Sequence, residues 1–363
     1  MSVEGYRFVN KGHHTDLETT ERLERYTKLL SLGWEEEYTK YRRLWSALPA
    51  AKEIRDYPLL VDLETVSRCN LKCPMCPTVT NEFIKKRVQP FKKGLLDPSL
   101  AYKVIEEIAG HVYCLRLSWI GEPTLHPNLI DFVKTAKEKG IPEVSFLTNG
   151  YRLDKDYARQ LIMAGIDQIT ISIDGMDDTY NKIRAPLLFD ETVKRVRGLW
   201  ELKNELGLQK PVVKIQGVWP AIKDRAEEFY NLFSPIVDLI AFNPLIDYLH
   251  KDDNIVYEDG FHCPQHYQRV VISSSGQAVM CSSDDFVDHP IGDINKQTIY
   301  QIWHSNEFNM RRRTHEIPDG FKQMKACSQC FYPRKMAPSE TTIINGRSVA
   351  IESYINRSQE IGT

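Results

Sequence analysis

Hydrophobic residues recur along this chain in two alternating patterns, one typical of strands and the other of helices. Short apolar runs predict six strands, and amphipathic stretches between them predict five helices. Strands that alternate with helices in this way form parallel βα units that wind in one direction. The predicted strands are 59–65, 113–119, 143–147, 168–173, 212–218 and 237–242, and the predicted helices are 98–109, 129–139, 155–164, 191–206 and 226–232.

Six strands are too few for a closed eight-stranded barrel, so the pattern favours an α/β fold with a partial (β/α)6 TIM barrel over residues 58–250. Residues 1–57 form an N-terminal helical extension, with two predicted helices broken near Gly33. The stretch 251–335 contains half of the cysteines and is expected to be a small separate domain. In the tail, 336–363, Asn345-Gly346 between β-forming residues predicts a two-residue hairpin turn.

Composition and charge narrow the class of protein. Of the 363 residues 42% are hydrophobic and 26% are charged, as in ordinary globular proteins. The net charge of −2 creates no field that would attract nucleic acid or an anionic membrane. No stretch approaches the ~20 apolar residues of a membrane span, and the first residues lack the apolar core of a signal peptide. We therefore expect a cytoplasmic protein that binds neither nucleic acid nor membranes.

The eight cysteines divide by their spacing into two sets and one leftover residue, which fits two metal sites and a free thiol better than disulfides. Closely spaced thiolates select zinc or iron–sulfur clusters. A structural zinc takes four ligands, whereas the first set offers three with no histidine nearby. Zinc stays open for the second set when it is considered alone. The sets are Cys69, Cys73 and Cys76, directly after the first predicted strand, and Cys263, Cys281, Cys327 and Cys330, with Cys114 left over.

The loops after the first four predicted strands lie at one edge of the expected barrel, the edge where barrel enzymes carry their chemistry. The cysteine loop follows the first strand, Gly121-Glu122-Pro123 the second, Thr148-Asn149-Gly150 the third and Asp174-Gly175 the fourth.

Charged residues alternate with apolar ones along the first two strands, so one strand face is expected to line a polar cavity. Glu64 on the first strand and Arg116 on the second are the predicted substrate contacts. A cavity lined by such side chains suits a hydroxyl- or amine-rich molecule. A buried network of ion pairs would explain the same pattern equally well.

The cysteine loop resembles the signature of the radical S-adenosylmethionine (SAM) enzymes. The resemblance implies a [4Fe–4S] cluster on Cys69, Cys73 and Cys76, an open iron that binds SAM, and cleavage of SAM to methionine and a 5′-deoxyadenosyl radical. It also implies a flavodoxin or ferredoxin as reductant. Gly121-Glu122-Pro123 resembles the family's GGEP motif, with Ile120 in place of the first glycine. The SAM contacts implied by the resemblance are Met75, Gly121, Glu122, Pro123, Asn149, Ser172, Asp174 and Arg184.

The second cysteine set resembles the auxiliary-cluster module of SPASM/Twitch radical SAM enzymes. The matching pattern is C-x₁₂-G-x₄-C followed by C-x₂-C, with Gly276 at the glycine. The resemblance implies one auxiliary [4Fe–4S] cluster with four protein ligands, since no cysteine follows Cys330. A cluster closed by four thiolates has no iron free to bind substrate.

The pattern with a single auxiliary cluster resembles that of the group that includes the 2-deoxy-scyllo-inosamine dehydrogenase. This resemblance implies oxidation of an alcohol carbon in a polar small molecule, such as a sugar or aminocyclitol. The auxiliary cluster would accept an electron in that reaction. The alternatives are epimerisation or decarboxylation of a sugar, modification of a peptide, and a non-catalytic metal-binding role. Cys114 lies about seven residues before Gly121, roughly 20 Å from the reactive edge, and is expected to be buried rather than to quench a radical.

Overall fold

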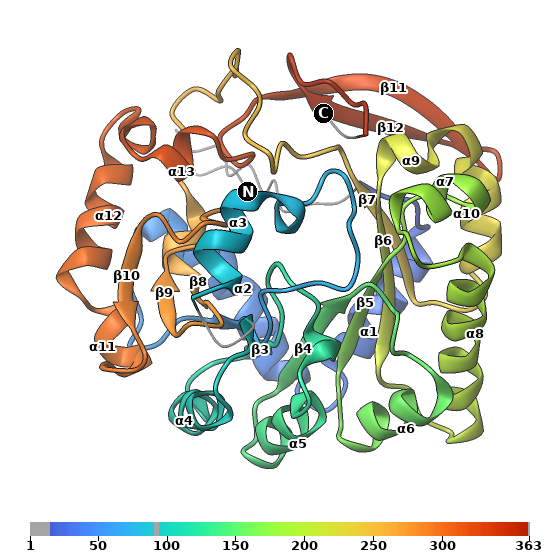
Figure 1. Cartoon of the computed structure of the whole chain (residues 1–363), viewed down its shortest axis with the longest axis horizontal. Helices are drawn as coiled ribbons and strands as arrows, with labels where there is room; N and C mark the ends of the chain where they lie inside the picture. The colour runs from blue at the N-terminus through green and yellow to red at the C-terminus, as the bar shows by residue number, and fades with distance from the viewer. Residues whose placement is uncertain (1–14, 91–93, 362–363) are drawn as a thin grey trace.

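A ten-stranded sheet runs through the computed structural model, which describes residues 15–90 and 94–361. Six neighbouring strands, β2 to β7, are parallel and adjacent in chain order, so the predicted partial (β/α)6 barrel is confirmed. Figure 1 shows helices α4, α5, α6 and α8 around the outside of this curved sheet. The strands are β2 (Leu60–Leu63), β3 (Cys114–Arg116), β4 (Glu143–Thr148), β5 (Gln168–Ser172), β6 (Val212–Val218) and β7 (Leu239–Asn243).

The barrel helices turn an apolar side toward the sheet. In α4 the buried residues Ala101, Val104, Ile105 and Ile108 recur every three or four positions, which places them on one side of the helix. The five predicted helices are present, and two short ones, α7 and α9, were not predicted. The helices are α4 (Pro98–Ile108), α5 (Leu129–Glu138), α6 (Lys155–Met163), α7 (Asp177–Ile183), α8 (Phe189–Glu205), α9 (Trp219–Ile222) and α10 (Ala226–Phe233).

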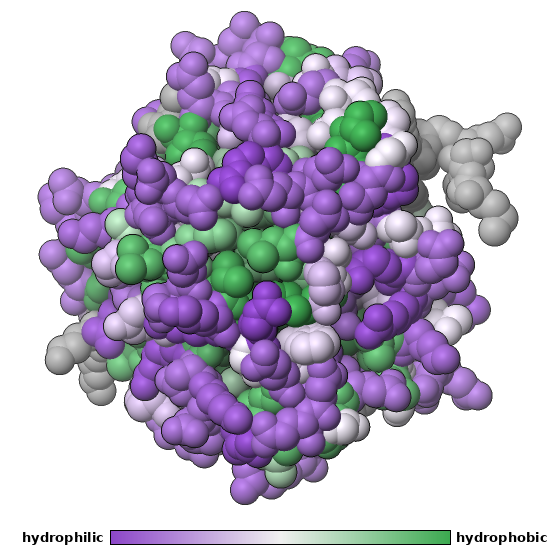
Figure 2. Space-filling view, turned by 90° about the vertical axis from the view of Figure 1, so that its right-hand side faces the viewer, coloured by the Kyte–Doolittle hydropathy of each residue, from purple (hydrophilic) through white to green (hydrophobic). Residues whose placement is uncertain are grey.

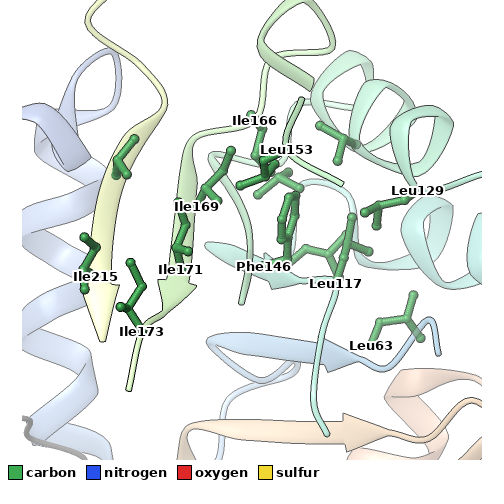
Figure 3. Close-up of a cluster of buried hydrophobic side chains, with 14 of the residues drawn as sticks. Leu63, Leu117, Leu129, Phe146, Leu153, Ile166, Ile169, Ile171, Ile173 and Ile215 are labelled. Atoms are coloured by element: carbon green, nitrogen blue, oxygen red, sulfur yellow. The ribbon is translucent and has the colours of Figure 1, made fainter. Parts of the chain in front are cut away.

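The barrel core lies between the strands and these helices, and Figure 3 shows part of it. Phe146, Ile171 and Ile215 come from three neighbouring strands and are at most 1% exposed. Burial of a side chain of this size contributes about 1.5–3 kcal/mol to the free energy of folding. Because side chains alternate along a strand, the intervening positions face the inside of the barrel.

The N-terminal extension extends the sheet and covers one end of the barrel. A two-residue strand, β1 (Thr15–Asp16), pairs antiparallel with β7. Helices α1 (Thr20–Ser31) and α2 (Glu35–Ala51) follow, separated by Gly33 at a φ of +86°. The aromatic side of α2 forms a second small core with the start of the barrel strands, which fixes the extension on the barrel. This core contains Trp34, Tyr41, Leu48, Leu59, Leu60, Tyr113, Cys114 and Tyr267.

The C-terminal cysteine domain continues the barrel sheet. Strand β8 (Arg269–Ile272) pairs parallel with β2 at the register Leu60↔Arg269, a pairing that the sequence pattern does not predict. Strands β9 (Gln277–Val279) and β10 (Pro290–Asp293) then extend the sheet in antiparallel fashion. The two cysteine sets are therefore attached to neighbouring strands of one sheet. The helices of this domain are α11 (Ile299–Trp303), α12 (Asn306–Glu316) and α13 (Lys325–Ser328).

A hairpin of β11 (Met336–Ile344) and β12 (Arg347–Tyr354) forms a separate two-stranded sheet, drawn in red in Figure 1. Its turn is Asn345-Gly346, both at positive φ, as a two-residue turn of this type requires. The indole N–H of Trp219 donates to Glu340 at 2.6 Å and attaches the hairpin to the barrel.

The surface of the molecule carries both polar and apolar residues. Figure 2 shows hydrophilic residues over most of one side, with apolar residues in the middle of the view. Within residues 15–90 and 94–361, no helix is both long and apolar enough to cross a membrane.

Candidate active site

The carboxyl ends of the barrel strands surround a cavity of about 330 Å³. Residues that follow or end each of the six barrel strands line it, and residues of the C-terminal domain close one side. The structure thus brings together most of the predicted site residues. Those that line the cavity are Cys69, Cys73, Met75, Cys76, Arg116, Gly121, Glu122, Asn149, Ser172, Asp174 and Arg184. Pro123 and Glu64 are not among its lining residues.

Hydrogen-bond donors orient the thiols of the first cysteine set. The Leu71 N–H donates to Cys69 Sγ at 3.4 Å, and the Thr78 hydroxyl lies 3.1 Å from Cys76 Sγ. The Asn149 amide donates to Cys69 Sγ at 3.6 Å and to Asn70 Oδ1 at 2.8 Å. The loop after β4 is therefore bonded to the cysteine loop after β2.

The pKa values of the Cys69 and Cys73 thiols show what a bound cluster would have to provide. Burial raises the pKa of Cys69 to about 11 and the pKa of Cys73 to about 12. Ligation requires thiolates, so a positively charged centre must offset the cost of three buried negative charges. Three thiols that converge on one cavity from one short loop suit an iron–sulfur cluster with an open iron.

Gly121 lets the loop after β3 approach the cysteine loop. A Cβ atom at this position would lie 2.1 Å from Val66 O and 2.7 Å from Arg68 O, so a larger residue does not fit. The neighbouring Glu122 N–H donates to Arg68 O at 2.9 Å. This backbone contact fixes the second loop against the first.

The side chain of Glu122 joins the loops after β3 and β4. Its buried carboxylate accepts hydrogen bonds from Thr124 Oγ1 at 2.6 Å, Thr124 N at 3.1 Å, Thr148 Oγ1 at 2.7 Å and Asn149 N at 2.7 Å. Burial raises its pKa. Three of these donors bind Oε1 and one binds Oε2, so this side chain holds the two loops together. Pro123 begins the short 3-10 helix η4 (Pro123–Leu125).

Asp174 and Arg184 form an ion pair at the edge of the cavity. Arg184 Nε and Nη2 lie 2.7 Å and 2.5 Å from Asp174 Oδ2. The other carboxylate oxygen accepts from Val218 N at 2.9 Å. Arg184 caps the C-terminus of α7, the short helix that the sequence pattern missed. The guanidinium is thus held with one side bonded to Asp174.

The two predicted substrate contacts differ in position. Asp62 binds Arg116 Nε at 2.6 Å and Arg269 Nη1 at 3.1 Å, and the Arg116 side chain is 34% exposed along the cavity. Glu64 is fully buried and pairs with Arg87 at 2.5 Å. The alternative of a buried ion-pair network therefore describes Glu64, while Arg116 remains available to a ligand.

The four C-terminal cysteines line a second, small cavity. Burial raises the pKa of Cys263 to about 12 and holds the pKa values of Cys281 and Cys327 well above their usual range, with further contributions from the other thiols of the set. Four buried thiols around one cavity suit a closed cluster, whose positive charge would allow all four to ionise. Within the described residues, no group of three His, Cys, Asp or Glu side chains converges on a point for a single ion, and each thiol set lines a cavity instead.

Neighbours of the second cysteine set reach the first cavity. Ser282 follows Cys281, Phe331 follows Cys330, and both line the cavity that contains the first set. The indole N–H of Trp119 donates to Ser282 O at 2.9 Å, which attaches the C-terminal domain to the end of β3. One cavity therefore extends from one cysteine set to the neighbours of the other.

Asp285 is a site residue that the sequence reasoning missed. It lines the cavity at 4% exposure, and among the described residues its carboxylate has no hydrogen bond or ion pair. Burial raises its pKa to about 7 against the opposing effect of Arg87, with smaller contributions from Asp284 and Glu64. The one sequence signal is its place in Asp284-Asp285, shortly after Cys281.

Two family models match the chain. The radical SAM superfamily model matches residues 63–203, and the SPASM model, an iron–sulfur cluster-binding domain, matches residues 263–331. These two domains account for the predicted cofactors, which are SAM with one cluster in the barrel and a second cluster in the C-terminal domain.

Curated relatives share part of this chain. A tungsten-containing aldehyde ferredoxin oxidoreductase cofactor-modifying protein from Pyrococcus furiosus is 28% identical over 206 residues, which cover 54% of each protein. A probable GTP 3′,8-cyclase from Methanococcus maripaludis is 28% identical over 208 residues, 55% of this chain and 64% of the cyclase. The chain thus matches about half to two thirds of the length of these relatives.

Solved structures of low sequence identity share the fold. BtrN in complex with AdoMet and 2-DOIA has a TM-score of 0.53 at 20% identity and covers 77% of this chain and 94% of BtrN. AnSMEcpe with bound AdoMet has a TM-score of 0.52 at 17% identity, covering 75% of this chain and 88% of the other. The chain therefore carries a radical SAM domain over residues 63–203 and, after its barrel, a SPASM domain over residues 263–331.

Proposed function

We propose that this protein is a radical SAM dehydrogenase that oxidises a hydroxyl-bearing carbon of a polar small molecule, such as a sugar or an aminocyclitol. The observation that supports this most is the shared cavity, lined by Cys69, Cys73 and Cys76 and also by Ser282 and Phe331, the neighbours of two C-terminal cysteines. A substrate in it would lie between the sites of hydrogen abstraction and electron acceptance.

Each cysteine set has a separate role in this proposal. Cys69, Cys73 and Cys76 hold a [4Fe–4S] cluster that binds SAM, and the four C-terminal cysteines hold an auxiliary [4Fe–4S] cluster. When bound, the cofactors supply a 5′-deoxyadenosyl radical and an electron acceptor, with a flavodoxin or ferredoxin as the source of the electron that cleaves SAM. Met75, Asn149 and Ser172 lie beside the first thiols and would contact SAM, together with the backbone of Gly121 and Glu122.

Asp285 is the proposed proton acceptor. Loss of a hydrogen atom from an alcohol carbon leaves a radical, which becomes a carbonyl when one proton leaves the hydroxyl group and one electron leaves the carbon. A cavity carboxylate that has no hydrogen bond or ion pair within residues 15–90 and 94–361, and whose pKa is raised to about 7, suits the proton transfer at neutral pH. Arg116, which lines the same cavity and shares Asp62 with Arg269 of β8, would orient the substrate hydroxyls as a donor.

The position of the leftover thiol favours oxidation over epimerisation quenched by a cysteine. Cys114 is 1% exposed and belongs to the small core beneath α2, outside the cavity. The other seven cysteines of the chain all belong to the two proposed ligand sets. No thiol of this chain is therefore available to return a hydrogen atom to a substrate radical.

A substrate screen tests the proposal. The protein, reconstituted without oxygen, is incubated with SAM, dithionite and a panel of sugars and aminocyclitols, and the products are analysed by mass spectrometry. The expected result is a product two hydrogens lighter than its substrate, with one 5′-deoxyadenosine formed per turnover. A product of unchanged mass that gains one solvent deuteron in deuterated water would contradict oxidation and favour epimerisation. The Cys69→Ala variant is the control and should form neither product.

A further inference from the structure

Two buried histidines lie beside the second cysteine set. His266 follows shortly after Cys263 in the 3-10 helix η6 (Pro264–Tyr267) and is fully buried, and His315 lies in α12 at 4% exposure. Their ring centroids are 4.2 Å apart and their planes are nearly perpendicular. Both rings line the small cavity that the four thiols share.

None of the four ring nitrogens of this pair has a hydrogen-bond partner among the described residues. A neutral imidazole carries one N–H donor and one acceptor nitrogen, and buried polar groups of this kind are nearly always bonded. Protonation would not supply partners either, because it adds a second N–H donor to each ring, and the cationic Arg312 already donates to the His266 carbonyl oxygen. The missing acceptors must therefore come from what the cavity holds.

We propose that His266 and His315 each donate an N–H hydrogen bond to the sulfur atoms of the auxiliary cluster and thereby raise its reduction potential. This inference rests on the proposed auxiliary cluster, whose inorganic sulfides and thiolates are the acceptors. Donors of this kind favour the reduced cluster, because reduction adds negative charge to the sulfur atoms. The pair would adjust the cluster to accept an electron from a substrate radical.

The test measures the potential directly and needs no substrate. In a protein with Cys69, Cys73 and Cys76 replaced by Ala, the auxiliary cluster is the one cluster left. Its reduction potential is measured by a redox titration followed by electron paramagnetic resonance. His266→Phe keeps the ring volume and removes the N–H donor. At a fixed applied potential we expect the ratio of reduced to oxidised cluster to fall about tenfold, a shift of about 59 mV for one electron.

Two further variants separate hydrogen bonding from packing. His266→Gln keeps a side-chain N–H and should restore most of the original potential. His111→Phe, at an exposed histidine that stacks on Tyr57, should leave it unchanged. His315→Phe gives an independent measurement and replaces the first variant if His266→Phe does not fold.

Three outcomes would overturn the inference, and each is distinct. An unchanged potential in His266→Phe and His315→Phe, with iron retained, would exclude the hydrogen bonds. Loss of iron from both folded variants would instead assign imidazole as a cluster ligand. Absence of iron from the parent triple variant would overturn the auxiliary cluster itself, and with it both the electron acceptor of the proposed function and the inference.

Discussion

Arg184 illustrates at the scale of one residue how the structure refines a role implied by resemblance. The guanidinium is bonded on one side to Asp174, and it also lines the cavity beside Cys73. We predict that Arg184→Ala weakens SAM binding by about 1.5–3 kcal/mol, as expected for loss of a charge-assisted hydrogen bond.

The SAM affinity of the reconstituted variant, measured by calorimetry, checks this prediction. Arg184→Lys is the matched control, because it keeps the charge and loses the fixed pair of donors, so it should recover only part of the affinity. An unchanged dissociation constant in Arg184→Ala would assign the arginine to the support of Asp174 alone.

Asp285 predicts a dependence on pH. A base must be ionised, so with a pKa raised to about 7 the rate of substrate oxidation should rise as the pH increases through 7. Asp285→Asn should abolish the oxidised product and this pH dependence, while SAM cleavage continues. A product rate that is independent of pH in the wild type would contradict the role.

The raised pKa of the Asp285 carboxyl also predicts an effect of pH on protein stability, which can be measured without a substrate. Its pKa is higher in the folded protein than the ordinary value of 3.8, so its contribution to stability is complete below that value and is lost as the pH rises through about 7. Thermal unfolding of wild type and Asp285→Asn at pH 6 and pH 8 checks this, and the wild type should lose more stability between the two. Equal losses in both proteins would argue against the raised pKa.

At the scale of helices and strands, the sequence was sufficient to predict those elements that have a strong local pattern. The six parallel strands and five barrel helices were predicted because each has its own apolar periodicity, and the hairpin turn because Asn345-Gly346 is a local signal. Strand β1 has two residues and α9 has four, too few to show a period. Helix α7 has seven residues, about two turns, which is also too short for a clear apolar period, and it was not predicted.

The contact between the loops after β2 and β3 gives a prediction about elements. Gly121→Ala would place a methyl group 2.1 Å from Val66 O, so the loops must separate. We expect a loss of about 1–3 kcal/mol in the free energy of unfolding and a large loss of SAM cleavage. Gly198→Ala, in helix α8 with open space around the new methyl group, is the control and should stabilise the protein by about 0.5–1 kcal/mol. The measurement is urea unfolding. A wild-type free energy of unfolding in Gly121→Ala would contradict the close approach of the two loops.

At the scale of the whole molecule, the sequence predicted the two cysteine sets but not how they face each other. The pairing of β2 with β8 joins segments about 200 residues apart in the chain, and no local pattern specifies it. Asp285, Ser282 and Phe331 reach the first cavity only through this pairing. Site residues on the barrel loops could be predicted because each follows its own strand, whereas those of the C-terminal domain depend on tertiary docking.

The two-site arrangement predicts the iron content of the protein. Three thiols line one cavity and four line another, so anaerobic reconstitution should give about eight irons per chain, from two four-iron clusters. Replacement of Cys69, Cys73 and Cys76 by Ala should leave about four irons and abolish SAM cleavage, because the remaining cluster has no open iron. Replacement of Cys281 and Cys327 should also leave about four irons but retain SAM cleavage, since the first set is intact.

Iron analysis and quantification of 5′-deoxyadenosine on the two variants check both halves of the prediction. Retention of SAM cleavage by the first variant would overturn the assignment of the SAM-binding cluster, and a full complement of eight irons in the second would overturn that of the auxiliary one.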